Sequence, residues 1–231
     1  ITHAATHTKK VIFHPRMMPA VVICDPELTI GMPAHMTAGT GMDALAHCLE
    51  AYCAPAYHPF CEGIALEGAR LVAGALACAV RDGSDIEARA HMMAAAAMGA
   101  TAFQKGLGAI HSLSHPVGAL YDTHHGLTNA VFMPYVLAFN RPAIQQKIER
   151  LAAFLGLTDA SFNGFMNFVL DLRAEIGIPH TLAGLDVDGA RADQIAEMAV
   201  IDPTAPGNPV KLTLEAARSI FDDALAGSLA R

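Results

Sequence analysis

The chain has 231 residues, of which 53% are hydrophobic and 16% are charged, with a formal net charge of -7. This length suits one large domain or two small ones, and the apolar stretches are interrupted by Arg, Glu or His before they reach the ~20 residues of a bilayer crossing, so no membrane span is expected. With only 15 Lys and Arg residues, the chain offers no basic stripe for a phosphate backbone, so nucleic acid is not an expected partner.

The first part of the chain carries the strand signals. Short apolar runs at 10–13 and 20–24 predict strand remnants or extended lead-ins. From about Thr40 onward, apolar residues recur at three- and four-residue spacing, which is typical of packed helices. We expect these helices at residues 40–52, 59–81, 86–103, 111–121, 125–140, 142–155, 160–176, 190–201 and 213–226. The prediction is a mainly α fold in which residues 1–231 form a single helical domain and residues 1–36 are mostly an extended lead-in.

The cysteines and the first residues bear on cellular location. Five cysteines form no C-x-x-C pair, and their odd number argues against a complete disulfide framework, so we expect a reducing cytoplasm. The opening ITHAATHTKK has no initiator Met, apolar core or cleavage signal. We therefore expect no targeting segment, and a start that continues from another part of a longer protein.

Two groups of residues have the spacing of metal ligands. Asp43 and His47 stand four apart in an expected helix, so both side chains project from the same face. The second group consists of His111, His115, His124 and His125. One Asp with two or three His suits a divalent ion such as Fe²⁺ or Zn²⁺ and leaves a position for a substrate oxygen. The alternative is that each i, i+4 pair is only a cap or a hydrogen-bonded pair.

Two long stretches resemble a known family. They are CDPELTIGMPAHMTAGTGMDALAHCLEAY (24–52) and GLGAIHSLSHPVGALYDTHHGLTNA (106–130). Both resemble the signatures of the iron-containing (group III) alcohol dehydrogenases, and in the first Asp25, Pro33, Asp43 and Glu50 occupy the characteristic places. The resemblance extends over essentially the whole chain. It implies the multi-helix C-terminal domain of the iron-containing alcohol dehydrogenase and dehydroquinate synthase-like fold, with the N-terminal dinucleotide-binding domain absent.

The resemblance also implies roles for individual residues. The implied metal ligands are Asp43, His47, His111 and His125. His115 matches a histidine that lies beside the metal and the nicotinamide, so it is expected to relay a proton or orient the substrate; the alternative is a hydrogen-bond partner of a ligand. His124 stands where the family has Pro. Phe103 and Leu107 fall near the substrate pocket, with core packing as the alternative. Lys105 is expected in a solvated loop, with an unusual charge near the pocket as the alternative.

The implied activity is that of an NAD(P)-dependent alcohol dehydrogenase. The metal, Fe²⁺ or Zn²⁺, polarises the oxygen of a small alcohol or aldehyde while hydride passes to or from NAD or NADP. Gly106-Leu107-Gly108 lacks the third glycine and the preceding strand of a dinucleotide fingerprint. We therefore expect this chain to be the metal-binding half of a homo-oligomeric enzyme and to be inactive alone. Alternatives are a glycerol dehydrogenase, a dehydroquinate synthase-like enzyme or a non-catalytic helical fragment.

Overall fold

The computed structural model describes the chain except for residues 1, 4–7, 10–13 and 230–231. The α-helices of the described residues are α1 (Ala34–Cys53), α2 (Pro59–Arg81), α3 (Ile86–Ala102), α4 (Ala109–Tyr121), α5 (His125–Phe154), α6 (Phe162–Glu175), α7 (Ala192–Val200) and α8 (Leu214–Ala226). The short 3₁₀ helices are η1 (Pro15–Met17), η2 (Pro26–Thr29), η3 (Phe103–Lys105), η4 (Leu182–Leu185) and η5 (Ala205–Gly207). Strands β1 (Thr2–His3) and β2 (Thr8–Lys9) form an antiparallel pair. The expected mainly helical fold is confirmed.

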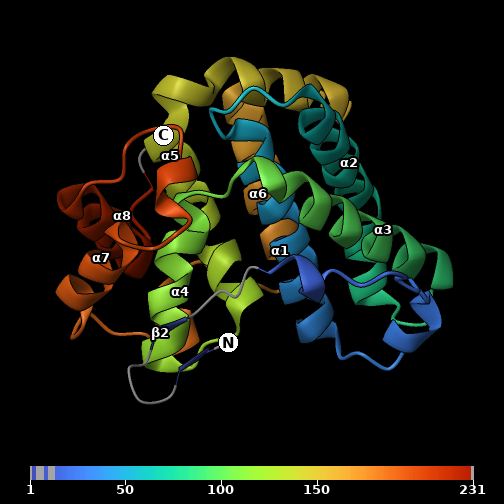
Figure 1. Ribbon diagram of the computed structural model, residues 1–231, viewed down its shortest axis with the longest axis horizontal. Coiled ribbons are helices and arrows are strands. Elements are labelled where there is room, and N and C mark those ends of the chain that lie inside the picture. The colour runs from blue at the N-terminus through green and yellow to red at the C-terminus, as the bar shows by residue number, and fades with distance from the viewer. Residues whose placement is uncertain (1, 4–7, 10–13, 230–231) are drawn as a thin grey trace.

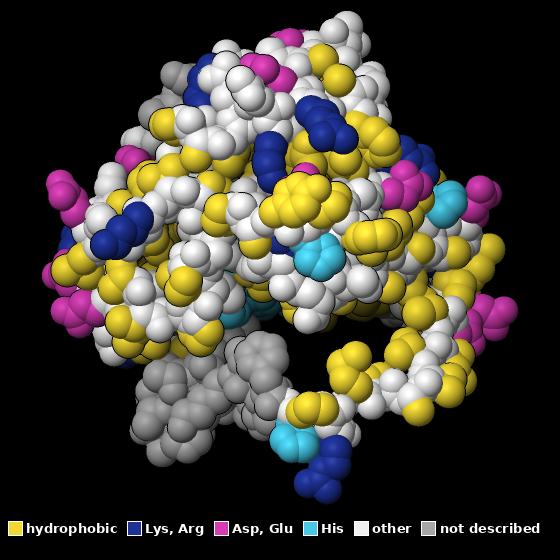
Figure 2. All heavy atoms as spheres, turned by 45° about the horizontal axis from the view of Figure 1, so that its top comes forward, with side chains coloured by type: hydrophobic (Ala, Val, Ile, Leu, Met, Phe, Trp, Pro, Cys, Tyr) yellow, Lys and Arg dark blue, Asp and Glu magenta, His cyan; other side chains and the backbone are white. Residues whose placement is uncertain are grey.

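The lead-in differs from a strand. The run at 20–24 belongs to no strand and is exposed, with Val21 at 77% and Ile23 at 84% of full accessibility, because no neighbouring strand accepts its backbone hydrogen bonds. Of the two alternatives for this run, the extended lead-in is therefore the one that forms. Figure 2 shows part of this segment as an arm with apolar side chains that stands off the helical body. The run at 10–13 lies outside the described residues.

Helix α5 corrects one expected boundary. The sequence predicts a break between residues 140 and 142, but the structure has one helix of 30 residues with Pro134 and Pro142 inside it. A proline removes one backbone hydrogen bond and bends a helix without having to end it. Asn140 and Ile144 are buried on either side of Pro142, so packing holds both segments in place. In Figure 1 the ribbon of α5 changes direction between its segment beside α4 and its yellow segment across the top.

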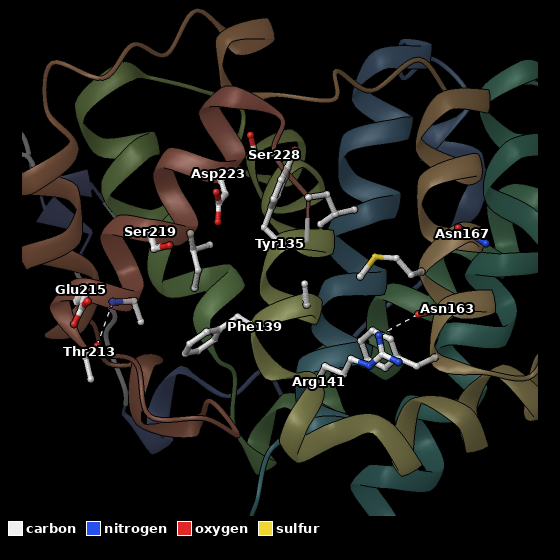
Figure 3. Close-up of a pocket in the computed structure, with 16 residues that line it drawn as sticks. Tyr135, Phe139, Arg141, Asn163, Asn167, Thr213, Glu215, Ser219, Asp223 and Ser228 are labelled. Atoms are coloured by element: carbon white, nitrogen blue, oxygen red, sulfur yellow. Dashed lines mark hydrogen bonds between the residues drawn. The ribbon is translucent and has the colours of Figure 1, made fainter. Parts of the chain in front are cut away.

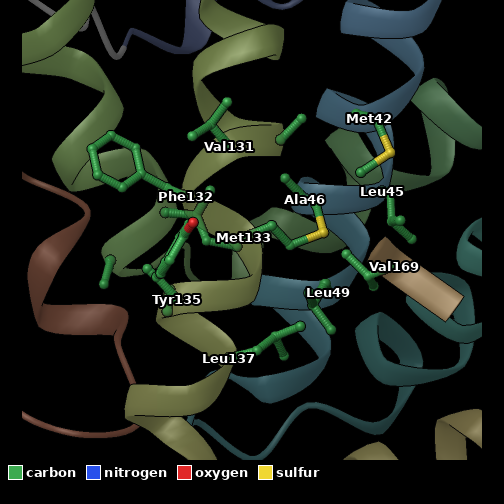
Figure 4. Packing of buried hydrophobic residues seen from close by; sticks show 14 of the residues in the cluster. Met42, Leu45, Ala46, Leu49, Val131, Phe132, Met133, Tyr135, Leu137 and Val169 are labelled. Carbon is green, nitrogen blue, oxygen red and sulfur yellow. The ribbon is translucent and has the colours of Figure 1, made fainter. Parts of the chain in front are cut away.

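The core forms where α1 packs against α2, α3 and α5, while α5 also contacts α4, α6 and α8. Figure 4 shows apolar side chains of this core: Met42, Leu45, Ala46 and Leu49 from α1, Val131, Phe132, Met133, Tyr135 and Leu137 from α5, and Val169 from α6. Small residues let the helices approach closely. A Cβ at Gly99 of α3 would lie 2.9 Å from the Cβ of His47 and 3.2 Å from the carbonyl oxygen of Ala44. The position of His47 is thus fixed by tight packing of α3 on α1.

One helix of the described residues, α2, is long and apolar enough to cross a membrane by length and composition alone. Core helices of folded domains can have the same length and composition. Helix α2 packs against α1 and α3, and nearly half of its most apolar part is buried. Its composition alone does not indicate a membrane protein.

Candidate metal centre

Three helices bring four potential ligands together. Asp43 and His47 lie one turn apart on α1, His111 lies in the first turn of α4, and His125 is the first residue of α5. The Oδ1 atom of Asp43 is 3.9 Å from Nε2 of His47, 3.5 Å from Nε2 of His111 and 3.6 Å from Nε2 of His125. The three histidines that the sequence predicts as ligands therefore converge on an oxygen of the fourth predicted ligand, Asp43.

These separations fit a bound ion. Two ligand atoms that each lie about 2.1 Å from one ion are at most about 4.2 Å apart, and the three separations from Oδ1 of Asp43 meet this limit. The ligand atoms of Asp43, His47 and His111 also lie within 4.8 Å of one another, a group that does not include His125. The rings are also arranged around a common centre: those of His47 and His111 are stacked at 4.7 Å, and those of His111 and His125 are tilted at 5.2 Å. The spacing and the chemistry of the donor atoms both suit a first-row divalent ion.

The charge of Asp43 agrees with this arrangement. Burial acts to raise the pKa of Asp43, but the hydrogen bond with His111 and the charges of His47 and His125 outweigh it and hold the pKa well below its ordinary value. Burial lowers the pKa of His111, yet its bonds to Asp43 and Glu50 prevail and raise the pKa to about 9. Burial is the main cause of the lowered pKa of His47. The site thus keeps the carboxylate of Asp43 ionised among three histidine rings.

Glu50 fixes the orientation of His111. Its Oε2 atom is 2.7 Å from Nδ1 of His111, and its Oε1 atom accepts the backbone N–H of Ile110 at 2.7 Å. An ionised carboxylate only accepts hydrogen bonds, so Nδ1 of His111 carries the proton and Nε2 turns toward Asp43. Asn208 accepts the backbone N–H of Ala109 at 3.0 Å. Glu50 and Asn208 thus accept the first two backbone N–H groups of α4, which the N-cap residue Gly108 cannot bind because it has no side chain.

His115 lies beside the four ligands and pairs with a carboxylate that the sequence reading missed. Its ring is stacked on that of His125 at 5.4 Å, and its Nδ1 is 2.8 Å from Oδ2 of Asp202. The other oxygen of Asp202 accepts the backbone N–H and the hydroxyl of Thr204 at 2.9 and 2.6 Å. Burial acts to raise the pKa of Asp202, but its bonds to His115 and Thr204 lower it. Asp202 is 87 residues from His115, so local spacing carries no signal for this pair.

The two adjacent histidines at the start of α5 have different positions. His124 is the N-cap residue, and its Nδ1 accepts the backbone N–H of Leu127 at 3.3 Å. His125 is the one whose Nε2 approaches Asp43. An imidazole therefore performs at His124 the capping that Ser or Asp usually performs.

The residues of η3 and the following turn differ in their surroundings. The ring of Phe103 is 5.3 Å from that of His47, so the structure brings this predicted pocket residue to the centre. Leu107 is half-buried in the turn between η3 and α4. The expectation of a solvated Lys105 is wrong, because its side chain has no exposed area.

Lys105 instead joins the end of α1 to α2. Its Nζ donates to the carbonyl oxygens of Ala51 and Tyr52 at 3.0 and 3.1 Å and lies 2.9 Å from Oε1 of Glu62. Lys147 binds the same carboxylate oxygen and the Tyr52 carbonyl. Burial lowers the pKa of Lys105. The carbonyl end of α1 attracts cations because the helix dipole is negative there.

A separate cavity of about 610 Å³ opens between α5, α6 and α8 (Figure 3). Its walls include Tyr135, Phe139 and Arg141 of α5 and Asp223 of α8, and Arg141 donates to Oδ1 of Asn163 at one end of it. None of the four ligand residues lines this cavity. Tyr135 is ten residues beyond His125, about 15 Å along a straight helix, so the cavity is distinct from the metal centre.

Comparisons with known proteins find related sequences and structures. The family model for the Fe-containing alcohol dehydrogenase family, C-terminal, matches residues 37–225. A 4-hydroxybutyrate dehydrogenase from Cupriavidus necator is 40% identical over 94% of this chain and 59% of its own length. An NAD-dependent methanol dehydrogenase from Bacillus methanolicus is 36% identical over 97% of this chain and 61% of its own.

Solved structures have the same fold. A 1,3-propanediol oxidoreductase superposes with a TM-score of 0.83 at 37% identity, over 87% of this chain and 55% of that one. An iron-containing alcohol dehydrogenase from Thermococcus thioreducens gives a TM-score of 0.87 at 31% identity, over 94% of this chain and 57% of that one. The chain thus spans about three fifths of the length of the curated relatives it matches.

Proposed function

Because this chain belongs to the Fe-containing alcohol dehydrogenase family, we propose that it is the metal-binding half of an NAD(P)-dependent alcohol dehydrogenase. The observation that carries the proposal is the convergence of His47, His111 and His125 on Oδ1 of Asp43. The reaction interconverts a small alcohol with its aldehyde or ketone, while NAD(P)⁺ and NAD(P)H exchange a hydride.

Asp43, His47, His111 and His125 would hold Fe²⁺, as the family name indicates, or Zn²⁺, which the same nitrogen and oxygen donors suit. The ion supplies Lewis-acid polarisation of the substrate oxygen. Glu50 keeps Nε2 of His111 directed at the centre, and the ionised Asp43 supplies negative charge to hold a cation.

His115 is the proposed proton carrier. Its Nδ1 is held by Asp202, and no hydrogen bond among the described residues involves its Nε2, which would accept the hydroxyl proton of an alcohol. The carboxylate of Asp202 then stabilises the imidazolium that forms. Phe103, packed beside His47, would provide an apolar wall for the carbon chain of the substrate.

The nicotinamide cofactor requires a second binding element. The Gly106 to Gly108 turn follows one helix and opens another, which is not the strand-to-helix context of a phosphate loop. We propose that a dinucleotide-binding domain completes the enzyme, that His115 faces the nicotinamide, and that the complete enzyme is a cytoplasmic homo-oligomer.

Metal content tests the proposal. The chain, purified without chelator and loaded anaerobically with Fe²⁺, should retain near one ion per chain by elemental analysis. His111→Ala should lose the ion, whereas His91→Ala, a change at an exposed histidine on α3, should keep it. Equal iron in all three proteins, or iron in none, would overturn the assignment. In the complete enzyme, 4-hydroxybutyrate and 1,3-propanediol are the first substrates to assay for NADH formation, because two relatives of this chain are dehydrogenases of these compounds.

A further inference from the structure

Asn129 contacts the metal centre without being one of its four predicted ligands. It lies on α5 one turn after His125 and is fully buried. Its Nδ2 atom is 2.7 Å from Oδ1 of Asp43, 3.1 Å from Nε2 of His125 and 3.2 Å from Nε2 of His111. One amide nitrogen thus lies against the ligand atoms of three of the four metal-binding residues.

The amide lies on the inner side of the centre. If Nδ2 of Asn129 lay between the four ligands, it would also be bonded to His47. Among the hydrogen bonds of the described residues, none joins Asn129 to His47. The side chains of Asp43, His47 and His125 are 23%, 20% and 28% exposed, whereas that of His111 is 2% exposed. The exposed three therefore form the mouth of the centre, and Asn129 with His111 forms its floor.

The orientation of the amide follows from its neighbours. The Oδ1 atom of Asn129 is buried and has no hydrogen-bond partner among the described residues. A buried carbonyl without a partner is unfavourable. The reversed amide would place its oxygen 2.7 Å from the Asp43 oxygen, an acceptor against an acceptor, and would leave the NH₂ group in the position that lacks a partner. The N–H of Asn129 therefore faces the centre and bonds to Asp43, while its carbonyl oxygen stays buried without a hydrogen-bond partner among the described residues.

We propose that Asn129 is a positioning residue that closes the inner face of the metal centre. Its N–H fixes the ligand oxygen of Asp43, and its bulk excludes a solvent ligand from the floor. A bound ion therefore has its open coordination position only at the mouth, where the substrate enters. This inference rests on the metal-dependent function proposed above.

Cobalt provides a spectroscopic test. The chain is titrated with Co²⁺, whose visible absorption weakens as the number of ligands rises from four to six. In Asn129→Ala a water enters from the floor, so the absorption should weaken, and the Co²⁺ affinity should fall about 10–100-fold, as for other groups that orient ligands. The matched control, Asn163→Ala, removes an exposed amide that bonds to Arg141 on another face and should match the wild type. An Asn129→Ala protein with wild-type affinity and spectrum would overturn the inference.

A second variant covers the case in which Asn129→Ala does not fold. Asn129→Asp keeps the shape of the side chain but places a carboxylate, in place of the N–H donor, against the carboxylate of Asp43. The metal-free variant should therefore have a lower Tm than the wild type. Because a bound cation offsets the repulsion between the two carboxylates, Co²⁺ should raise the Tm of the variant by more than it raises that of the wild type. An equal rise in both proteins would overturn the role of the N–H. If the wild-type chain binds no Co²⁺, both the proposed metal centre and the role of Asn129 are rejected. If the wild-type chain binds Co²⁺ and the Asn129 variants bind it equally well with the same spectrum, only the role of Asn129 is rejected.

Discussion

Replacing Glu50 by Gln keeps the shape of a buried side chain but removes one of its two acceptor atoms. In the wild-type protein the two carboxylate oxygens serve different donors, the backbone N–H of Ile110 and Nδ1 of His111, each at 2.7 Å. Glutamine has one carbonyl oxygen and an NH₂ group that cannot accept either donor. The N–H of Ile110 or of His111 Nδ1 therefore loses its acceptor, unless the proton of His111 moves to Nε2 and that nitrogen can no longer bind a metal.

The expected size of the effect follows from that count. A hydrogen bond to a charged group contributes about 1.5–3 kcal/mol, which corresponds to a factor of about 10–150 in an equilibrium constant. If the glutamine oxygen stays with Ile110, His111 loses its orientation and the loss appears as weaker metal binding. If it stays with His111, the first turn of α4 loses a partner and the loss appears in the free energy of unfolding.

Two measurements separate these outcomes. Competition titration with a chromogenic chelator gives the metal affinity, and thermal unfolding of the metal-free protein gives its stability. Glu175→Gln, at an exposed position of α6, is the matched control and should change neither. A Glu50→Gln protein that equals the wild type in both measurements would refute the reasoning, because two buried donors would then share a single acceptor at no cost.

Three other substitutions test the site and its supports. In the complete enzyme, His115→Gln should lower kcat by about 10²–10⁴-fold while metal content stays unchanged, and Asp202→Asn should lower it less; parallel loss of metal would show that His115 is a ligand. His124→Ala should cost about 1 kcal/mol in thermal unfolding through the lost cap and should keep the metal, so metal loss in elemental analysis would argue against His125 as the ligand. Lys105→Met should lower the free energy of unfolding by about 1–3 kcal/mol in denaturant titration, because the Ala51 carbonyl oxygen loses its donor while Glu62 keeps Lys147; an unchanged free energy of unfolding would contradict the buried contact.

The sequence could predict what depends on local spacing. Asp43 and His47 stand one turn apart, and an α-helix necessarily places such side chains on one face. The end of α2 at Arg81 and the start of α8 after Thr213 follow the usual signals of turn residues and caps. Pro142 was misleading because a proline marks either a bend or an end, and only the packing around it decides.

The supports of the site depend on contacts that no local pattern encodes. Asp202 meets His115 across 87 residues, and Glu50 meets His111 across 61. Lys105 is buried because the end of α1 and Glu62 reach it from elsewhere in the chain. Asn129 is different: it stands four residues after His125 on the same helix face, so the rule that paired Asp43 with His47 could have identified it.

The short turn η3 has a consequence for enzyme engineering. One of its residues, Lys105, binds the last carbonyl groups of α1, while another, Phe103, places its ring against His47. The backbone that carries Phe103 is therefore anchored two residues away by a buried ammonium group. A library that varies position 103 should change the shape of the space beside His47 while the anchored backbone stays in place. If Lys105 is varied in the same library, shape and anchoring change together, so screens for new alcohols should hold residue 105 constant.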